Sequence, residues 1–151
     1  MTIGLYIHVP FCVRKCLYCD FTSYPYHPSD AQTYLQAVRR EMRLYGKILS
    51  TEERKVSSLF VGGGTPTCLP ADGLAAMIED VGCVFKLLPD CEITVEANPG
   101  TIGREGLTQL AAAGVNRLSI GVQSFQDGLL KMLGRIHDAR AALEAVQAAR
   151  K

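Results

Sequence analysis

The feature that most constrains this chain is a fourfold alternation of short apolar runs with amphipathic segments. Apolar runs rich in β-forming residues occupy 5–9, 56–61, 91–97 and 117–122. After each run, apolar residues recur at the three- and four-residue intervals of one helix face. Strands and helices in alternation favour parallel pairing with right-handed crossovers. The sequence therefore predicts an α/β fold of parallel βα units, as an open doubly wound sheet or as part of a barrel.

Local signals mark the ends of the predicted helices. Ser29, with Gln32 three residues later, forms a capping-box pattern and is the predicted N-cap of the first helix. Pro70 is predicted to open the second helix, and Gly114 to close the third. The fourth helix is predicted to begin near Asp138.

The composition indicates a soluble globular domain. The chain has 151 residues, of which 48% are hydrophobic and 21% charged, enough for one domain with a core. Its net charge of +1 gives no electrostatic case for a nucleic-acid partner or a membrane surface. No apolar run reaches the roughly 20 residues of a membrane span, and no signal peptide opens the chain. These features predict a cytoplasmic protein with reduced thiols.

Unusual residues follow each predicted strand. The first strand leads to a group of cysteines, the second to 62–64 (Gly-Gly-Gly), the third to Glu96 and the fourth to Gln123. Because the carboxyl ends of parallel strands meet at one edge of a sheet, we expect these features to share one rim. Each residue alone would be an ordinary loop residue, but together they predict a functional site.

Three cysteines, Cys12, Cys16 and Cys19, have the spacing C-x3-C-x2-C. A structural zinc site needs a fourth ligand, which would come from His8, His27 or a distant cysteine. A redox pair of two cysteines would leave the third without a role. Closely spaced thiolates are typical of an iron–sulfur cluster, and three of them on a four-iron cube leave one iron open. The spacing favours the cluster over zinc or a redox pair.

The other cysteines lie outside this motif. Six cysteines would allow three disulfides, but that pattern belongs to small secreted scaffolds and fits this composition poorly. Cys68, Cys83 and Cys91 are each predicted to be small buried hydrophobic residues.

The segment YIHVPFCVRKCLYCDF resembles the cluster-binding signature of radical S-adenosylmethionine (SAM) proteins. GGGTPT, EANP and VNRLSIGVQSF…LGRIH resemble further blocks of the oxygen-independent coproporphyrinogen III oxidase group, in the same order. The resemblance implies a partial TIM-like radical SAM barrel. Residues 1–151 are then expected to be its front four βα units, the N-terminal part of a truncated core domain.

The resemblance also implies two cofactors. Cys12, Cys16 and Cys19 would hold a 4Fe–4S cluster, and SAM would chelate the fourth iron. In this family the reduced cluster passes an electron to the SAM sulfonium, which yields a 5′-deoxyadenosyl radical. No catalytic residue is assigned beyond the cluster site. The positions that match SAM-contacting residues of the family are Tyr6, Tyr18, Gly62, Gly63, Gly64, Thr65, Glu96, Gln123 and Arg135.

Two departures separate this chain from the oxidase. Phe21 stands where the oxidase carries a further cysteine, and Tyr6 lies too close to the start for its longer N-terminal lead. In both features the chain resembles the HemW-type heme chaperone branch of this group. That resemblance implies heme binding and heme transfer to an acceptor protein. The alternative is an oxidase that decarboxylates coproporphyrinogen III to protoporphyrinogen IX. The chaperone and the oxidase both imply a heme or porphyrin ligand and a reductant such as flavodoxin or ferredoxin. The third hypothesis is a zinc-binding or structural α/β domain.

Overall fold

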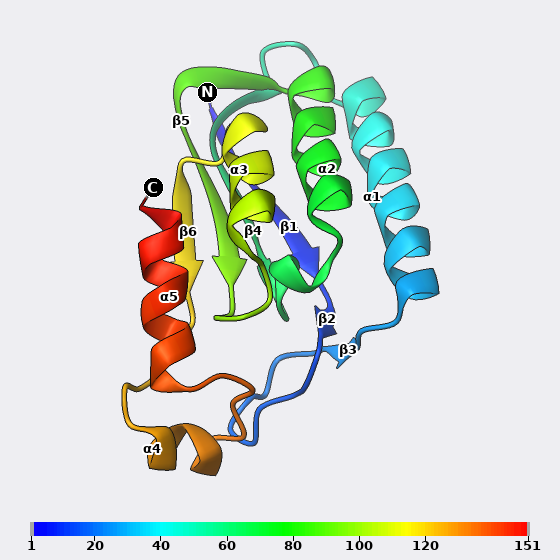
Figure 1. Cartoon of the computed structure of the whole chain (residues 1–151). Helices are drawn as coiled ribbons and strands as arrows, with labels where there is room; N and C mark the ends of the chain where they lie inside the picture. Colours follow the sequence, from blue (N-terminus) through cyan, green and yellow to red (C-terminus); the bar gives the residue numbers. More distant parts are fainter. Residues whose placement is uncertain (1, 151) are drawn as a thin grey trace.

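The computed structural model describes residues 2–150 and has a four-stranded parallel sheet at its centre (Figure 1). The strands of this sheet, in spatial order, are β1 (Ile3–Val9), β4 (Lys55–Gly63), β5 (Lys86–Ala97) and β6 (Arg117–Ile120). A separate parallel pair joins β2 (Phe11–Cys12) to β3 (Tyr24–Pro25). The helices are α1 (Pro28–Ile48), α2 (Ala71–Val84), α3 (Arg104–Ala112), α4 (Asp127–Met132) and α5 (Ala139–Ala149), with a 3₁₀ turn η1 (Pro66–Cys68).

The predicted parallel sheet of βα units is confirmed. Every pair of neighbouring strands in the sheet is parallel, with Val9 opposite Gly63 and Ala97 opposite Ile120. The carboxyl ends of the strands therefore lie at one edge, which in Figure 1 faces the loops around β2 and α4. This edge is where the unusual residues of the sequence follow each strand.

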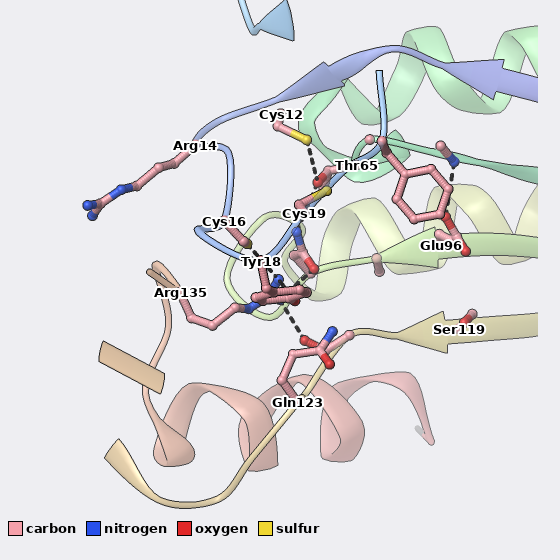
Figure 2. A pocket seen from close by; sticks show the side chains of 16 residues that line it. Cys12, Arg14, Cys16, Tyr18, Cys19, Thr65, Glu96, Ser119, Gln123 and Arg135 are labelled. Carbon is pink, nitrogen blue, oxygen red and sulfur yellow. Dashed lines mark hydrogen bonds between the residues drawn. The ribbon is translucent and has the colours of Figure 1, made fainter. Parts of the chain in front are cut away.

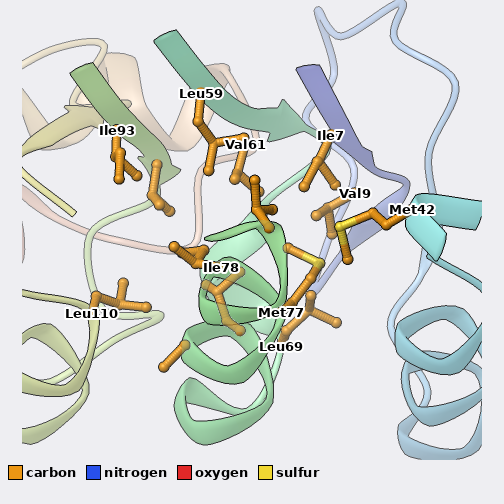
Figure 3. Close-up of a cluster of buried hydrophobic side chains, with 14 of the residues drawn as sticks. Ile7, Val9, Met42, Leu59, Val61, Leu69, Met77, Ile78, Ile93 and Leu110 are labelled. Carbon is orange, nitrogen blue, oxygen red and sulfur yellow. The ribbon is translucent and has the colours of Figure 1, made fainter. Parts of the chain in front are cut away.

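Helices α1, α2, α3 and α5 cover one face of the sheet (Figure 1), and the hydrophobic core lies between the sheet and the helices (Figure 3). Side chains from alternate strand positions, Ile7, Val9, Leu59, Val61 and Ile93, meet side chains of α2 and α3 there, Leu74, Met77, Ile78 and Leu110. The positions between them, such as Tyr6 and His8 on β1, point to the opposite face and are exposed. Burial of the first face supplies the main hydrophobic stabilisation of the domain.

The predicted capping box at Ser29 is wrong. Helix α1 begins at Pro28, its N-cap residue is His27, and no side chain caps it. Proline fits the first helical position because its φ is already helical and it has no N–H to satisfy. The Ser29 hydroxyl lies inside the first turn, where it bonds His27 Nδ1 at 2.8 Å. The proline therefore sets the start of the helix two residues earlier than the capping pattern predicts.

The prediction that Cys83 is buried is also wrong, because this thiol is exposed. The core-facing residues of α2 include Ile78 and Val81, and a residue two positions after Val81 points away from that face. Cys91 is buried and Cys68 is half-buried, in agreement with the prediction for Cys91. Burial, and secondarily the charge of Cys12, raises the pKa of the Cys68 thiol to about 12.

Several strand boundaries differ from the sequence prediction, and several short elements were not predicted. Strand β5 begins at Lys86, five residues before the predicted start, while β6 ends at Ile120. The elements β2, β3, η1 and α4 have between two and six residues, too few for a periodic pattern to appear. Among the helices of residues 2–150, none combines the length and apolarity needed to cross a membrane.

We expect Leu74→Ala to lower the free energy of unfolding by about 2–5 kcal/mol, because it leaves a cavity in the core between α2 and the sheet. Leu74 is 0% exposed. Denaturant unfolding followed by circular dichroism measures the change. Leu44→Ala, in α1, is the matched control because Leu44 is 57% exposed, and its cost should stay within about 0.5 kcal/mol. Equal costs for the two variants would contradict the core described above.

Candidate cofactor site

A cavity of about 250 Å³ opens at the carboxyl edge of the sheet (Figure 2). Its walls come from the loop after β2, from the ends of β4, β5 and β6, and from the segment that follows β6. Of the residues predicted for the site, it brings together Cys12, Cys16, Tyr18, Cys19, Gly63, Gly64, Thr65, Glu96, Gln123 and Arg135. The residues that were predicted to share one edge of the sheet thus line a single cavity.

Two residues predicted for the site lie elsewhere. Tyr6 lines a second cavity, between β1 and α1, and its hydroxyl is 2.9 Å from His8 Nδ1. Burial, and then the negative charge of Glu96, raises the pKa of Tyr6. Gly62 lies beside the cavity wall, where a Cβ would come within 2.9 Å of Glu96 Oε2. Both residues are therefore close to Glu96 without lining the main cavity.

The cysteine loop, residues 12–24, is fixed at its base and on one side. At its base the Tyr24 N–H donates to Pro10 O at 2.7 Å. On its side the Leu17 N–H donates to Leu133 O at 3.1 Å, at the end of α4. Within the loop, the Cys19 N–H donates to Cys16 O at 3.1 Å and forms a turn. Helix α4, which the sequence did not predict, thus supports the cysteine loop.

Two of the three thiols accept a hydrogen bond from the chain. Thr65 Oγ1 donates to Cys12 Sγ at 3.6 Å, and Arg135 Nη1 donates to Cys16 Sγ at 3.2 Å (Figure 2). Cys12 is buried, and Cys16 and Cys19 are half-buried. Within residues 2–150, no three His, Cys, Asp or Glu side chains are arranged as a ready set of metal ligands. The three thiols therefore share the cavity wall without forming a ready set of ligands.

The glycines at the end of β4 allow a close approach of three strands. Gly63 has a φ of 115°, a conformation that other residues rarely adopt. The Gly64 N–H donates to Val9 O at 2.8 Å, and a Cβ on Gly64 would lie 2.5 Å from Phe11 O and 3.0 Å from Cys12 Sγ. From the sequence, these glycines are predicted to let the backbone approach a ligand. The structure adds that Gly64 makes room for the strand that carries Cys12.

Glu96 is anchored to the glycine segment. Its Oε2 accepts a hydrogen bond from the Gly63 N–H at 3.0 Å. Gln123, across the cavity, has a φ of 64° and is the one non-glycine residue with a positive φ among residues 2–150. His137 supports this segment by bonding Val122 O through Nε2 at 3.1 Å, and burial lowers the pKa of His137. The carboxylate and the amide thus face the cavity from fixed backbone positions.

Asn98 is the main residue of the site that the sequence analysis missed. Its Nδ2 donates to Thr65 Oγ1 at 2.9 Å, and its Oδ1 accepts from Arg135 Nη2 at 2.6 Å. Arg135 Nη2 also donates to Gly121 O at 2.6 Å. Asn98 stands two residues after Glu96 in the block EANP, so the signal that pointed to Glu96 could also have found it.

Comparisons with known proteins show the family of this chain. The family model for the radical SAM superfamily matches residues 6–151. The curated heme chaperone HemW of Escherichia coli is 41% identical over 97% of this chain and 39% of its own length. HemW of Haemophilus influenzae is 39% identical over 98% of this chain and 39% of its length. The chain belongs to the radical SAM superfamily, and it spans about two fifths of these relatives.

A solved structure agrees with this assignment. The coproporphyrinogen III oxidase HemN of Escherichia coli, described as a radical SAM enzyme, superposes with a TM-score of 0.90 at 31% identity. The match covers 99% of this chain and 34% of that chain. The βα units described above are therefore those of a radical SAM fold.

Membership of the superfamily implies a 4Fe–4S cluster and SAM, and the cavity fits both. Three thiols from one loop supply the ligand type that iron–sulfur clusters take. Beside them lie Gly63 and Gly64, a carboxylate at Glu96 and a guanidinium at Arg135. These groups match the ammonium, carboxylate and hydroxyl groups that SAM presents.

We expect Gly64→Ala to push β2 away from the end of β4, because the added Cβ would meet Phe11 O and Cys12 Sγ. The overpacking should lower the free energy of unfolding by roughly 1–3 kcal/mol. Denaturant unfolding measures this loss. Gly128→Ala in α4 is the matched control, since a Cβ there has nothing within 4 Å, and it should be neutral or slightly stabilising. A Gly64→Ala chain as stable as the unmodified one would contradict this close packing.

Proposed function

We propose that Cys12, Cys16 and Cys19 hold a 4Fe–4S cluster and that SAM occupies the rest of the cavity. The observation that carries the proposal is that the three thiols share one cavity with the ends of β4, β5 and β6. In this proposal, residues 1–151 form the front part of a radical SAM core domain. When bound, the two cofactors together supply radical chemistry, while the protein binds, orients and shields them.

The remaining cavity residues have separate binding roles in this proposal. Glu96 accepts from the SAM ammonium with the lone pairs that Gly63 leaves free. Arg135 offers its Nε–H, which is buried and has no hydrogen-bond partner within residues 2–150, to the SAM carboxylate. The ring of Tyr18 stacks on the adenine. Gly63, Gly64 and Thr65 bind the methionine portion through their backbone, and Gln123 binds the ribose. Tyr6 and Gly62, which do not line this cavity, act through Glu96 beside them.

The whole protein is, in our proposal, a heme chaperone that binds heme and transfers it to an acceptor protein. The names of the two HemW relatives support this assignment, and so does Phe21, which lines the cavity. A flavodoxin or ferredoxin would reduce the cluster. The second candidate is a coproporphyrinogen III oxidase, which the structural match to HemN favours.

Cluster binding is tested by anaerobic reconstitution of the chain with iron and sulfide. We expect a thiolate-to-iron absorption band near roughly 400 nm, and its loss in Cys16→Ala. Cys83→Ala is the matched control, because this exposed thiol lies on α2, outside the cavity lining, and the band should be retained. Tetrahedral zinc binding with no band in the unmodified chain would overturn the cluster.

The two candidate functions differ in what happens to a porphyrin. For the chaperone we expect hemin to bind the reconstituted chain, seen as a shifted and sharpened Soret band. We also expect no decarboxylation of coproporphyrinogen III in an anaerobic assay with SAM and a reductant. Formation of protoporphyrinogen, with no hemin binding, would establish the oxidase instead.

A further inference from the structure

A continuous series of hydrogen bonds joins two of the three cysteine thiols. Starting from Cys12, its Sγ accepts from Thr65 Oγ1 at 3.6 Å, and Thr65 Oγ1 accepts from Asn98 Nδ2 at 2.9 Å. Asn98 Oδ1 then accepts from Arg135 Nη2 at 2.6 Å, and Arg135 Nη1 donates to Cys16 Sγ at 3.2 Å. We call Thr65, Asn98 and Arg135 the thiol bridge. Figure 2 labels its two ends, Thr65 and Arg135.

Asn98 is the central member of the thiol bridge because it both donates and accepts. Its amide nitrogen donates to Thr65 while its amide oxygen accepts from Arg135. The space around it is kept open by Gly121, where a Cβ would lie 2.8 Å from Asn98 Oδ1 and 3.4 Å from Arg135 Nη2. Thr65 itself is 2% exposed, so water does not compete for its hydroxyl.

We propose that Asn98 is a positioning residue that holds Arg135 and Thr65 on the two thiols and thereby sets the reduction potential of the cluster. The inference rests on the proposed cluster site. A hydrogen bond to a cluster-bound sulfur stabilises the reduced, more negative cluster and raises its potential. The bridge places one such donor on Cys12 and one on Cys16, and Asn98 orients both.

The role is distinct from binding of SAM by Arg135. A contact with the SAM carboxylate acts only when SAM is present. The bonds from Arg135 to Cys16 and Asn98 form within the chain itself, with no cofactor. The bridge should therefore show its effects in measurements made without SAM.

The first measurement is amide hydrogen exchange of the cluster-free chain, read over residues 12–24. We expect Asn98→Ala and Arg135→Gln to speed exchange in this loop, because both release Cys16 from the bridge. Gln147→Ala, on the exposed surface of α5, is the matched amide control, and Lys131→Gln, exposed on α4, is the matched charge control. Both controls should exchange like the unmodified chain.

The second measurement is a redox titration of the reconstituted cluster without SAM, followed by electron paramagnetic resonance. Asn98→Ala and Arg135→Gln should each shift the midpoint to a lower potential. The double variant should shift it no further than the larger single shift, because both changes break one series of bonds. Arg135→Lys, which keeps a positive charge but not the fork of donors, should recover only part of the shift.

Either of two results overturns the inference: an unchanged midpoint in Asn98→Ala, or shifts that add in the double variant. Should Asn98→Ala not fold, Thr65→Val, which keeps the shape and removes the hydroxyl donor, must lower the midpoint through Cys12. Failure of the proposed function looks different, because the unmodified chain would then take up no cluster at all.

Discussion

Parallel pairing of β1, β4, β5 and β6 is the constraint on which the rest of the molecule depends. Because the strands run in one direction, their carboxyl ends meet at one edge, and residues as distant as Cys16 and Arg135 come within hydrogen-bonding distance. The same pairing leaves one face for the helices and the core. A chain with mixed strand directions would divide these residues between two edges and would have no such cavity.

The cavity combines rigid strand ends with a loop that is held by side chains. Glu96 and Gly63 are fixed by the sheet, whereas the cysteine loop depends on β3, on the end of α4 and on Arg135. This division suits the cluster site that we propose. The three thiols would converge on iron while the strand ends that would face SAM stay in place.

Much of this arrangement could be predicted from the sequence, because the strands and helices have clear periodicity. The cysteine spacing, the glycines, the residues after each strand and the family resemblance led to ten of the sixteen residues that line the cavity. What could not be predicted depends on tertiary contacts. The role of Asn98 depends on its contact with Arg135, which is distant in the sequence. Helix α4 is too short to show periodicity. The predictions for Ser29 and Cys83 were wrong. Pro28 sets the start of α1 in place of the capping pattern, and Cys83 lies on the face of α2 that points away from the core.

The central claim is that three thiolates leave one iron of the cluster open for SAM. Mössbauer spectroscopy of the chain, reconstituted with the Mössbauer-active iron isotope, tests it most directly. Addition of SAM should change the isomer shift of one of the four irons and leave the other three as they were. A spectrum that SAM does not alter, or one that shows all four irons held by the protein before SAM is added, would contradict the account.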